Sequence, residues 1–179
     1  ARSSARSGRR PNASRTQLYG LHQGDWDDEL LEIFEIPRRL LPSVRPSSGE
    51  FGTTRRTLSL QDGVPIASLI GDSHGALFGQ AAFEPGMVKA TYGTGSSLMT
   101  MTPGPVRSAH GLSTTVAWAF ADRTYYALEG NITMTGGAID WFGQFLGGAN
   151  TSVTVADLAA TLHDTGGVYV VPAFAGLGA

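Results

Sequence analysis

The stretch Thr91-Tyr-Gly-Thr-Gly-Ser-Ser97 joins two segments with the composition of β-strands, residues 87–92 and 97–102. Two glycines around one threonine predict a tight turn, because glycine adopts backbone conformations that other residues avoid. Backbone N–H groups and hydroxyls of such a turn can donate hydrogen bonds to phosphate oxygens. An ordinary hairpin turn has the same composition, and the stretch lacks the third glycine of a dinucleotide fingerprint and the lysine of a P-loop. The turn alone therefore leaves a phosphate site and a plain hairpin both open.

A carboxylate lies just before this stretch, at a predicted junction between a strand and a helix. The apolar run at residues 66–70 predicts a buried strand, and residues 73–83 predict a helix. In α/β proteins, ligands bind at the carboxyl ends of strands. Asp72 is therefore a candidate general base or magnesium ligand. The plain alternative is a carboxylate that caps the helix.

The other expected elements alternate along the chain. Helical patterns cover residues 25–34, 133–146 and 154–162, with a further helical turn at 38–41. Strand patterns cover residues 112–120 and 124–128, which predict a hairpin with its turn near Asp122, and residues 168–171, which predict a buried strand. Residues 43–57 indicate a loop. Alternating helices and strands favour an α/β or α+β fold.

Two glycines, Gly136 and Gly137, lie near the start of the predicted 133–146 helix. Glycines at a helix N-terminus permit close approach of a ligand, and the first N–H groups of a helix can bind an anion. Close packing of the helix against another segment explains the same glycines. The sequence leaves both interpretations open.

Composition bounds the class of protein. A chain of 179 residues with 41% hydrophobic residues is long enough to bury a core as one domain, or to form pieces of two. The absence of cysteine excludes disulfides, thiolate zinc sites and thiol catalysis. No apolar run reaches the ~18 residues of a membrane span, and no signal-peptide pattern is present. We therefore expect a soluble, cytoplasmic protein with no membrane partner.

The N-terminal segment differs in charge from the rest of the chain. Residues 1–16 carry five of the 13 basic residues and no acidic one, whereas the whole chain has a net charge of -2. Residues 1–11 have low complexity and no aromatic side chain that stacks on bases, and the acidic remainder repels phosphate backbones. We expect a disordered basic arm at residues 1–11 and no nucleic-acid partner.

The tripeptide Gly71-Asp-Ser73 resembles the opening of the GDS-type ester hydrolases, in which the serine is the nucleophile. That chemistry needs a histidine base oriented by an acid. His74 adjoins the serine, and His110 and His163 lack the Asp-x-x-His arrangement of those enzymes. A hydrolase that uses Ser73 remains the weaker alternative, and the histidines predict neither a triad nor a metal set.

Several segments match one family in the same order along the chain. They include Asn12-Ala-Ser-Arg-Thr16, Trp26-Asp-Asp-Glu-Leu-Leu31, Gly71-Asp72, Ala76-Leu-Phe-Gly-Gln80, Thr91-Tyr-Gly-Thr-Gly95, Tyr126-Ala-Leu-Glu-Gly130 and Gly167-Val-Tyr-Val-Val-Pro-Ala-Phe174. Together they resemble the FGGY family of carbohydrate kinases, in its glycerol kinase-like branch. Each motif is weak by itself, and their shared order carries the resemblance.

The resemblance implies an α/β architecture, a partial actin-like ATPase (ribonuclease H-like) fold. Residues 12–83 correspond to the C-terminal part of the family's N-terminal domain, and residues 84–179 to the first part of its C-terminal domain. The implied activity is phosphorylation of a hydroxyl on a sugar or polyol, with ATP and Mg²⁺ as cofactors. A non-catalytic, nucleotide-binding member of the actin-like group is a further alternative. The full-length protein is a possible homo-oligomer.

The resemblance also implies roles for individual residues. Asp72 matches the catalytic base, which accepts the proton of the attacking hydroxyl. Thr94, between Gly93 and Gly95, matches the residue that contacts nucleotide phosphate. Gly136 matches a glycine that contacts the nucleotide, and Asp140 stands where glycerol kinases have a glutamine that also reaches it. No protein ligand for magnesium is assigned, because phosphates and waters hold most of its coordination sites in such enzymes.

Two substrate-binding positions depart from the glycerol kinase pattern. Ser73 replaces a glutamine that holds the polyol, and Ser97 replaces a phenylalanine that lies against it. Both changes substitute a small polar side chain for a large one. We therefore expect Asp72, Ser73 and Ser97 to line a roomier pocket, suited to a larger polyol or a keto-sugar such as a pentulose.

Some family motifs have no counterpart in this sequence. The family begins with an Asp-x-Gly-Thr-Thr phosphate loop, followed by an Arg-Glu pair that binds substrate, and it ends with adenosine-binding glycines. Because none of these matches, we expect the chain to be the middle third of such a kinase. We expect the 179-residue polypeptide alone to show no turnover.

Overall fold

The computed structural model describes residues 7–145 and 152–176. The chain forms two compact units. Unit 1 comprises Ala1–Lys89 and Met99–Glu129, and unit 2 comprises Ala90–Leu98 and Gly130–Ala179. No helix among the described residues is long and apolar enough to cross a lipid bilayer.

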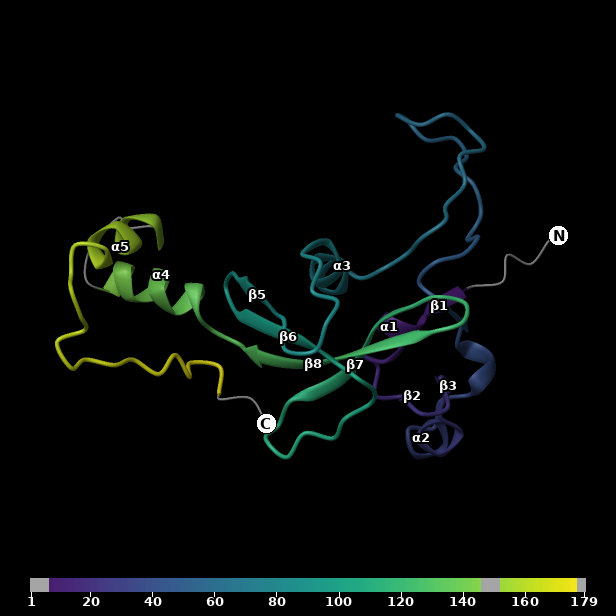
Figure 1. The fold of residues 1–179 in the computed structure, drawn as a ribbon, viewed down its shortest axis with the longest axis horizontal. Helices are drawn as coiled ribbons and strands as arrows, with labels where there is room; N and C mark the ends of the chain where they lie inside the picture. The colour runs from purple at the N-terminus through teal and green to yellow at the C-terminus, as the bar shows by residue number, and fades with distance from the viewer. Residues whose placement is uncertain (1–6, 146–151, 177–179) are drawn as a thin grey trace. The chain divides into compact units, whose positions relative to one another are not determined.

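The central sheet contains β5 (Val88–Tyr92), β6 (Ser96–Thr102), β8 (Thr124–Ile132) and β7 (Ser113–Ala119), hydrogen-bonded in that order (Figure 1). Strands β7 and β8 are antiparallel. The strands predicted at residues 87–92 and 97–102, and the hairpin with its turn near Asp122, are therefore confirmed, with ends displaced by a few residues.

Strand β7 is buried on both faces and divides two hydrophobic clusters of unit 1. Val116 packs with the N-terminal segment of the chain, whereas Ala117 and Trp118 pack with Leu77 of α3 (Asp72–Gly79). The pairing with β8 shifts register between Val116 and Trp118, which is the signature of a β-bulge. Helices on both faces of a sheet are typical of the predicted α/β architecture.

Residues 7–11 are ordered, which corrects the prediction of a disordered arm for that part of the chain. Strand β1 (Ser7–Arg9) pairs in parallel with β4 (Ser43–Arg45), and α1 (Arg10–Ala13) follows it directly. Helix α1 contacts β7, and its Ala13 is buried. Strand pairing and burial on β7 supply the order that composition alone did not predict. Residues 1–6 of the expected arm lie outside the described residues.

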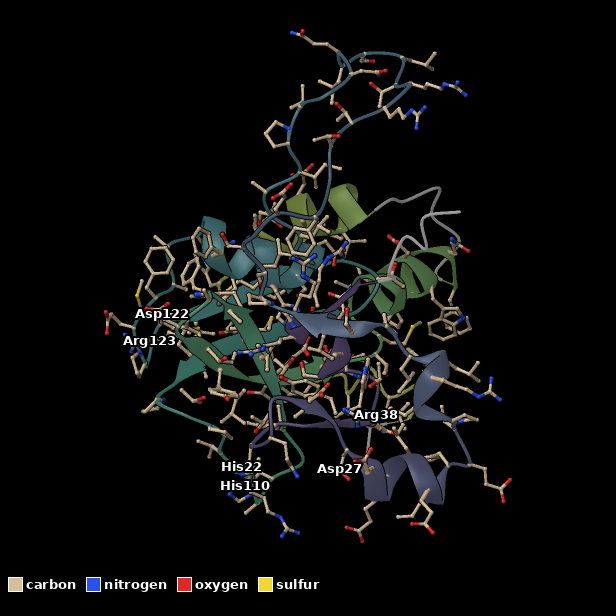
Figure 2. The ribbon with its side chains drawn as sticks, turned by 90° about the vertical axis from the view of Figure 1, so that its right-hand side faces the viewer. His22, Asp27, Arg38, His110, Asp122 and Arg123 are labelled. Carbon is tan, nitrogen blue, oxygen red and sulfur yellow. The ribbon has the colours of Figure 1, made fainter. Side chains whose placement is uncertain are left out.

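A small antiparallel pair precedes the helix predicted at residues 25–34. It consists of β2 (Tyr19–Gly20) and β3 (Asp25–Trp26). Helix α2 (Asp28–Ile33) begins later than predicted because the Asp27 side chain accepts hydrogen bonds from two N–H groups of the first turn. A 3₁₀ turn, η1 (Arg38–Leu40), forms where a helical turn was predicted. Figure 2 shows Asp27 and Arg38 near α2.

The buried strand predicted at residues 66–70 does not form, which is a correction. Residues 47–54 and 63–69 instead make an antiparallel ribbon with backbone hydrogen bonds such as Phe51 N–H to Ile66 O (2.9 Å) and Leu69 N–H to Ser47 O (2.9 Å). The side chains from residue 66 to 70 are exposed or half-buried. The ribbon extends as an arm between β4 and α3 (Figure 1). The prediction of a loop at residues 43–57 was wrong for its first residues, because Ser43–Arg45 form β4.

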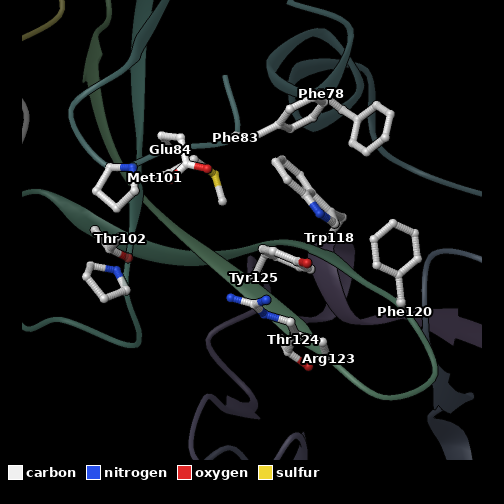
Figure 3. Close-up of a pocket in the computed structure, with 12 residues that line it drawn as sticks. Phe78, Phe83, Glu84, Met101, Thr102, Trp118, Phe120, Arg123, Thr124 and Tyr125 are labelled. Atoms are coloured by element: carbon white, nitrogen blue, oxygen red, sulfur yellow. The ribbon is translucent and has the colours of Figure 1, made fainter. Parts of the chain in front are cut away.

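Aromatic side chains form a cluster in unit 1 beside a cavity of about 430 Å³ (Figure 3). Trp118 stacks on Tyr125 with 5.4 Å between ring centroids, and Phe78 and Phe83 meet Trp118 edge to face. The Arg123 guanidinium lies over the Tyr125 ring, 4.7 Å from its centroid, in a cation–π contact. No predicted site residue lines this cavity.

Unit 2 contains the two helices predicted near the end of the chain. They are α4 (Gly136–Phe145) and α5 (Ser152–Ala159). Position 146 of the first prediction lies outside the described residues. On α4, Trp141 stacks on Phe145 and also contacts Phe174, with centroid distances of 5.3 and 4.8 Å.

The prediction of a buried strand at residues 168–171 is wrong. Val168, Tyr169, Val170 and Val171 are 64–84% exposed and belong to no strand. A strand needs a neighbour for its N–H and C=O groups. Within the part of the chain that the structure describes, no strand pairs with this segment.

Candidate functional site

Asp72 is the first residue of α3, and its side chain is exposed. A carboxylate is favourable there because it faces the positive end of the helix dipole. One carboxylate oxygen, Oδ1, accepts a hydrogen bond from the Ser73 N–H at 2.7 Å. Asp72 follows the exposed ribbon of residues 47–54 and 63–69, and no strand ends directly before it, so the prediction of a strand end was wrong. The prediction of a helix start is confirmed. Asp72 is therefore open to a ligand at a defined helix terminus.

The Ser73 side chain is held by two strands of the sheet. Its Oγ accepts a hydrogen bond from Lys89 Nζ at 3.0 Å, and its hydroxyl donates towards Met99 Sδ at 3.4 Å. Lys89 belongs to β5 and is only 1% exposed. We did not assign Lys89 to the site from the sequence. Lys89 is the one lysine in a chain whose other basic residues are all arginines, and this was the feature of the sequence that could have drawn attention to it.

His74 is buried in a polar network beneath the start of α3. Its Nε2 lies 3.2 Å from Thr115 Oγ1, which lies 2.8 Å from Ser14 Oγ. Ser14 donates its one hydroxyl proton to the Pro11 carbonyl, so Thr115 donates to Ser14. The His74 Nε2 then carries the proton of its hydrogen bond to Thr115, so a neutral imidazole at this position is the Nε2–H tautomer.

The environment of His74 lowers its pKa below the ordinary value of 6.5. Burial is the largest cause, because a charged imidazolium loses its hydration. The Glu129 carboxylate opposes this effect, whereas the Arg15 and Lys89 cations reinforce it and Asp72 opposes it weakly. Glu129 is itself buried and forms an ion pair with Arg15 at 2.9 Å. At neutral pH the structure therefore favours uncharged His74.

We expect the chain to lose stability as the pH falls below 6.5, in part through His74. Between the folded and unfolded pKa values of His74, the unfolded chain binds more protons, so acid favours unfolding. Urea unfolding at pH 7.5 and at lower pH values measures this dependence. A His74→Gln variant should show a smaller loss on acidification than the unsubstituted chain. An equal loss in both would contradict the assignment to His74.

The contacts of Ser73 bear on the hydrolase alternative. That mechanism requires a histidine within hydrogen-bond reach of the serine. Among the described residues, the hydrogen-bond partners of Ser73 Oγ are Lys89 and Met99, while His74 Nε2 is bonded to Thr115. The structure thus describes no Ser73–histidine pair.

In unit 2, the Gly93–Gly95 turn lies against the start of α4. The Thr94 carbonyl accepts hydrogen bonds from the N–H groups of Thr135 (2.8 Å) and Gly137 (3.1 Å), and the Gly93 carbonyl accepts one from Gly136 N–H (3.0 Å). These N–H groups, which the sequence suggested were free for a ligand, are occupied. Of the two interpretations that the sequence left open for Gly136 and Gly137, these contacts favour close packing of the helix.

The glycines of this unit have little room for a side chain. A Cβ on Gly136 would lie 2.4 Å from the Gly93 carbonyl oxygen, and a Cβ on Gly95 would lie 2.7 Å from the Ile132 carbonyl oxygen. Both neighbours are backbone atoms, which cannot rotate away as a side chain can. The backbone of the Gly93–Gly95 turn thus packs directly against the backbone at the start of α4. The structure brings Gly93, Thr94, Gly95 and Gly136 together, and their contact with a nucleotide stays a prediction.

The remaining predicted residues of unit 2 lie near this junction. Thr94 is exposed at the tip of the turn. Ser96 Oγ lies 2.8 Å from Thr135 Oγ1, which ties β6 to the residue before α4. Ser97 is half-buried on β6, and Asp140 is half-buried on α4, one turn after Gly136. The described residues contain no group of three or more histidine or acidic side chains that could hold a metal ion.

Two family models match the chain. Residues 10–79 match the N-terminal domain of the FGGY family of carbohydrate kinases, and residues 88–179 match its C-terminal domain. The chain therefore belongs to the FGGY family of carbohydrate kinases. The expected junction after residue 83 falls in the interval between the two matched stretches, and as a domain boundary it stays a prediction.

Individual relatives refine this result. The chain is 52% identical to a glycerol kinase of Halorhodospira halophila over 170 residues, which are 94% of this chain and 33% of the relative. A glycerol kinase of Burkholderia multivorans is 48% identical over 169 residues, again 94% of this chain and 34% of the relative. The chain thus spans about a third of the length of the curated relatives that it matches.

Solved structures agree on the fold. The crystal structure of Plasmodium falciparum glycerol kinase with ADP is similar with a TM-score of 0.84 and 33% identity, covering 97% of this chain and 35% of that one. A xyloylose kinase from Brucella ovis shares the fold with a TM-score of 0.78 at 20% identity, covering 95% of this chain and 35% of that one. The fold is therefore a part of the actin-like ATPase fold, as the sequence predicted.

Proposed function

We propose that this chain is part of an enzyme that phosphorylates a hydroxyl of a sugar or polyol at the expense of ATP, with Asp72 as general base. The observation that carries the proposal is an exposed carboxylate at the first position of α3, in a chain that belongs to a family of carbohydrate kinases. Asp72 accepts the proton of the attacking hydroxyl. Phosphoryl transfer depends on positioning and charge stabilisation, and the hydrogen bond from Ser73 N–H to Oδ1 leaves Oδ2 for the substrate.

The nucleotide is assigned to unit 2. The exposed Thr94 at the Gly93–Gly95 turn fits a contact to phosphate, and Gly136 keeps α4 close enough to the turn to shape it. Asp140, one turn along α4, is proposed to face the nucleotide. ATP supplies the γ-phosphoryl group, with Mg²⁺ held mainly by phosphates and waters. The similar glycerol kinase of Plasmodium falciparum, which was crystallised with ADP, supports the assignment of a nucleotide.

For the sugar or polyol, Asp72, Ser73 and Ser97 stay the proposed substrate residues, each on the ground of the family resemblance alone. The Ser73 hydroxyl accepts a hydrogen bond from Lys89 and donates its proton towards Met99, so at most one lone pair remains for the substrate. Small side chains at both serine positions support a substrate larger than glycerol. The relatives named above are glycerol kinases, so the size preference is a proposal about this chain alone.

A grafted kinase tests this function. In the Halorhodospira halophila glycerol kinase, the 170 matched residues are replaced by those of this chain. We expect ATP-dependent phosphorylation, with a higher kcat/KM for a larger polyol or a pentulose than for glycerol. The assay measures ADP release across a substrate panel. A clear preference for glycerol would contradict the pocket size but not the kinase.

The same graft distinguishes the alternatives. A folded graft that binds ATP without turnover on any substrate would favour a non-catalytic, nucleotide-binding protein. Ester hydrolysis that disappears in a Ser73→Ala variant would favour the hydrolase. The unmodified relative, prepared in parallel, shows that the assay itself works.

A further inference from the structure

Lys89 lies on the buried face of β5, where a hydrophobic residue is expected. On β5, Val88 is 61% exposed while the neighbouring Lys89 is 1% exposed. Side chains alternate between the two faces of a strand, so a shift by one residue would bury the valine and expose the lysine. Burying an ammonium group costs free energy unless it is well paired. The observed register therefore needs a compensating interaction.

That interaction is with the start of α3. Lys89 Nζ donates to Ser73 Oγ at 3.0 Å, and Ser73 is the second residue of the helix. A cation is disfavoured near a helix N-terminus because it meets the positive end of the helix dipole. Neither desolvation nor the dipole thus favours a lysine at this place. The hydrogen bond to Ser73 is the specific contact that the position provides.

Ser73 connects this contact to the candidate base. Its side chain is fixed between Lys89 on β5 and Met99 on β6, and its backbone N–H donates to Asp72 Oδ1 at 2.7 Å. Asp72 itself is exposed, so packing does little to hold its carboxylate. The contacts of the Ser73 side chain anchor the first turn of α3 against β5 and β6, and the Ser73 N–H in that turn holds one oxygen of the Asp72 carboxylate.

We infer that Lys89 is a positioning residue, which acts through Ser73 to hold the Asp72 carboxylate in the orientation that accepts the substrate proton. The inference rests on the proposed kinase function and extends it to a residue that does not touch the substrate. Misplacement of a reacting group by about 1 Å can cost ~10²-fold in rate. The contribution should therefore appear mainly in kcat, because Lys89 itself makes no proposed contact with the substrate and acts on the orientation of the base.

The test compares variants in the grafted kinase. Lys89→Met keeps the length and volume of the side chain and removes the charge and the donors, and we expect kcat to fall ~10–10²-fold with KM changed less than ~3-fold. Ser73→Ala should also lower kcat, and the kcat of the double variant should be no lower than that of the more severe single variant, because the Lys89–Ser73 contact is already lost in each. Met101→Leu is the control, because Met101 is a buried methionine of the same strand that takes no part in the anchor of Ser73, and this variant should change kcat less than ~2-fold.

Each result is decisive. An active graft whose Lys89→Met and Ser73→Ala variants keep full kcat, or lose it additively, would overturn the inference and leave the kinase function intact. A loss of stability with unchanged kcat would show a structural role only. If Lys89→Met fails to fold, the comparison of Ser73→Ala with Ser73→Thr replaces it, and threonine, which keeps the acceptor, should retain more kcat than alanine. If the unsubstituted graft is folded but inactive, the proposed function fails, and the inference fails with it.

Discussion

Replacing Asp72 by asparagine in the grafted kinase should lower kcat by ~10²–10⁴-fold. Asparagine has nearly the same shape, and its amide oxygen can still accept the hydrogen bond from Ser73 N–H that the structure shows at 2.7 Å. It cannot accept a proton from the attacking alcohol. The loss should therefore be in the chemical step, with little change in stability or in the KM for the nucleotide. Steady-state kinetics with the preferred substrate measure it.

Asp122→Asn is the matched control for this substitution. Asp122 lies in the turn between β7 and β8, and Figure 2 shows its position in unit 1. The same loss of one carboxylate there should leave kcat within ~2-fold, since a surface substitution away from a site has little effect. Retention of more than a tenth of the activity in Asp72→Asn would remove Asp72 from the role of general base.

Replacing Gly136 by alanine should destabilise the chain by ~1–3 kcal/mol. Alanine in a helix is normally better than glycine by ~1 kcal/mol, so helix propensity predicts the opposite sign. Steric contact decides, because the new Cβ would lie 2.4 Å from the Gly93 carbonyl oxygen. To relieve the overlap, the turn must separate from α4 and weaken its three hydrogen bonds to the helix start. The urea midpoint of the 179-residue chain reports the change.

Gly79→Ala provides the contrast. Gly79 ends α3, and a Cβ there would meet no atom within 4 Å. We expect that variant to be as stable as the unsubstituted chain or more stable by up to ~1 kcal/mol. If both alanine variants gained stability alike, the close packing of the turn on α4 would be wrong.

The local parts of the candidate site could be predicted from the sequence. A Gly-Thr-Gly turn between two strand patterns and a carboxylate at a helix start are short-range features, and both are present. Their composition left the role of the turn open. The structure adds that the turn uses its carbonyls to hold α4, which follows from three-dimensional contact between residues about 40 positions apart.

The errors share a physical cause. Residues 66–70 and 168–171 are both apolar and rich in strand formers, and the pattern predicted burial for both. Burial depends on what covers a segment, and a short apolar run does not carry that information. The first segment pairs with residues 47–54 in an exposed ribbon, and the second pairs with no described strand. The contact between Lys89 and Ser73 was missed for a related reason, since hydrophobic alternation on β5 argues for the opposite register.

Strand β5 is the outermost strand of its sheet, bonded to β6 on one side. An outer strand has one neighbour that fixes its register. A shift of β5 by one residue would bury the side chain of Val88 in place of that of Lys89. Transfer of apolar surface out of water would by itself favour that slip. The short Gly93–Gly95 turn and the hydrogen bond from Lys89 to Ser73 on α3 both favour the observed alignment, and loss of that hydrogen bond would reduce the free-energy gap to the slipped one.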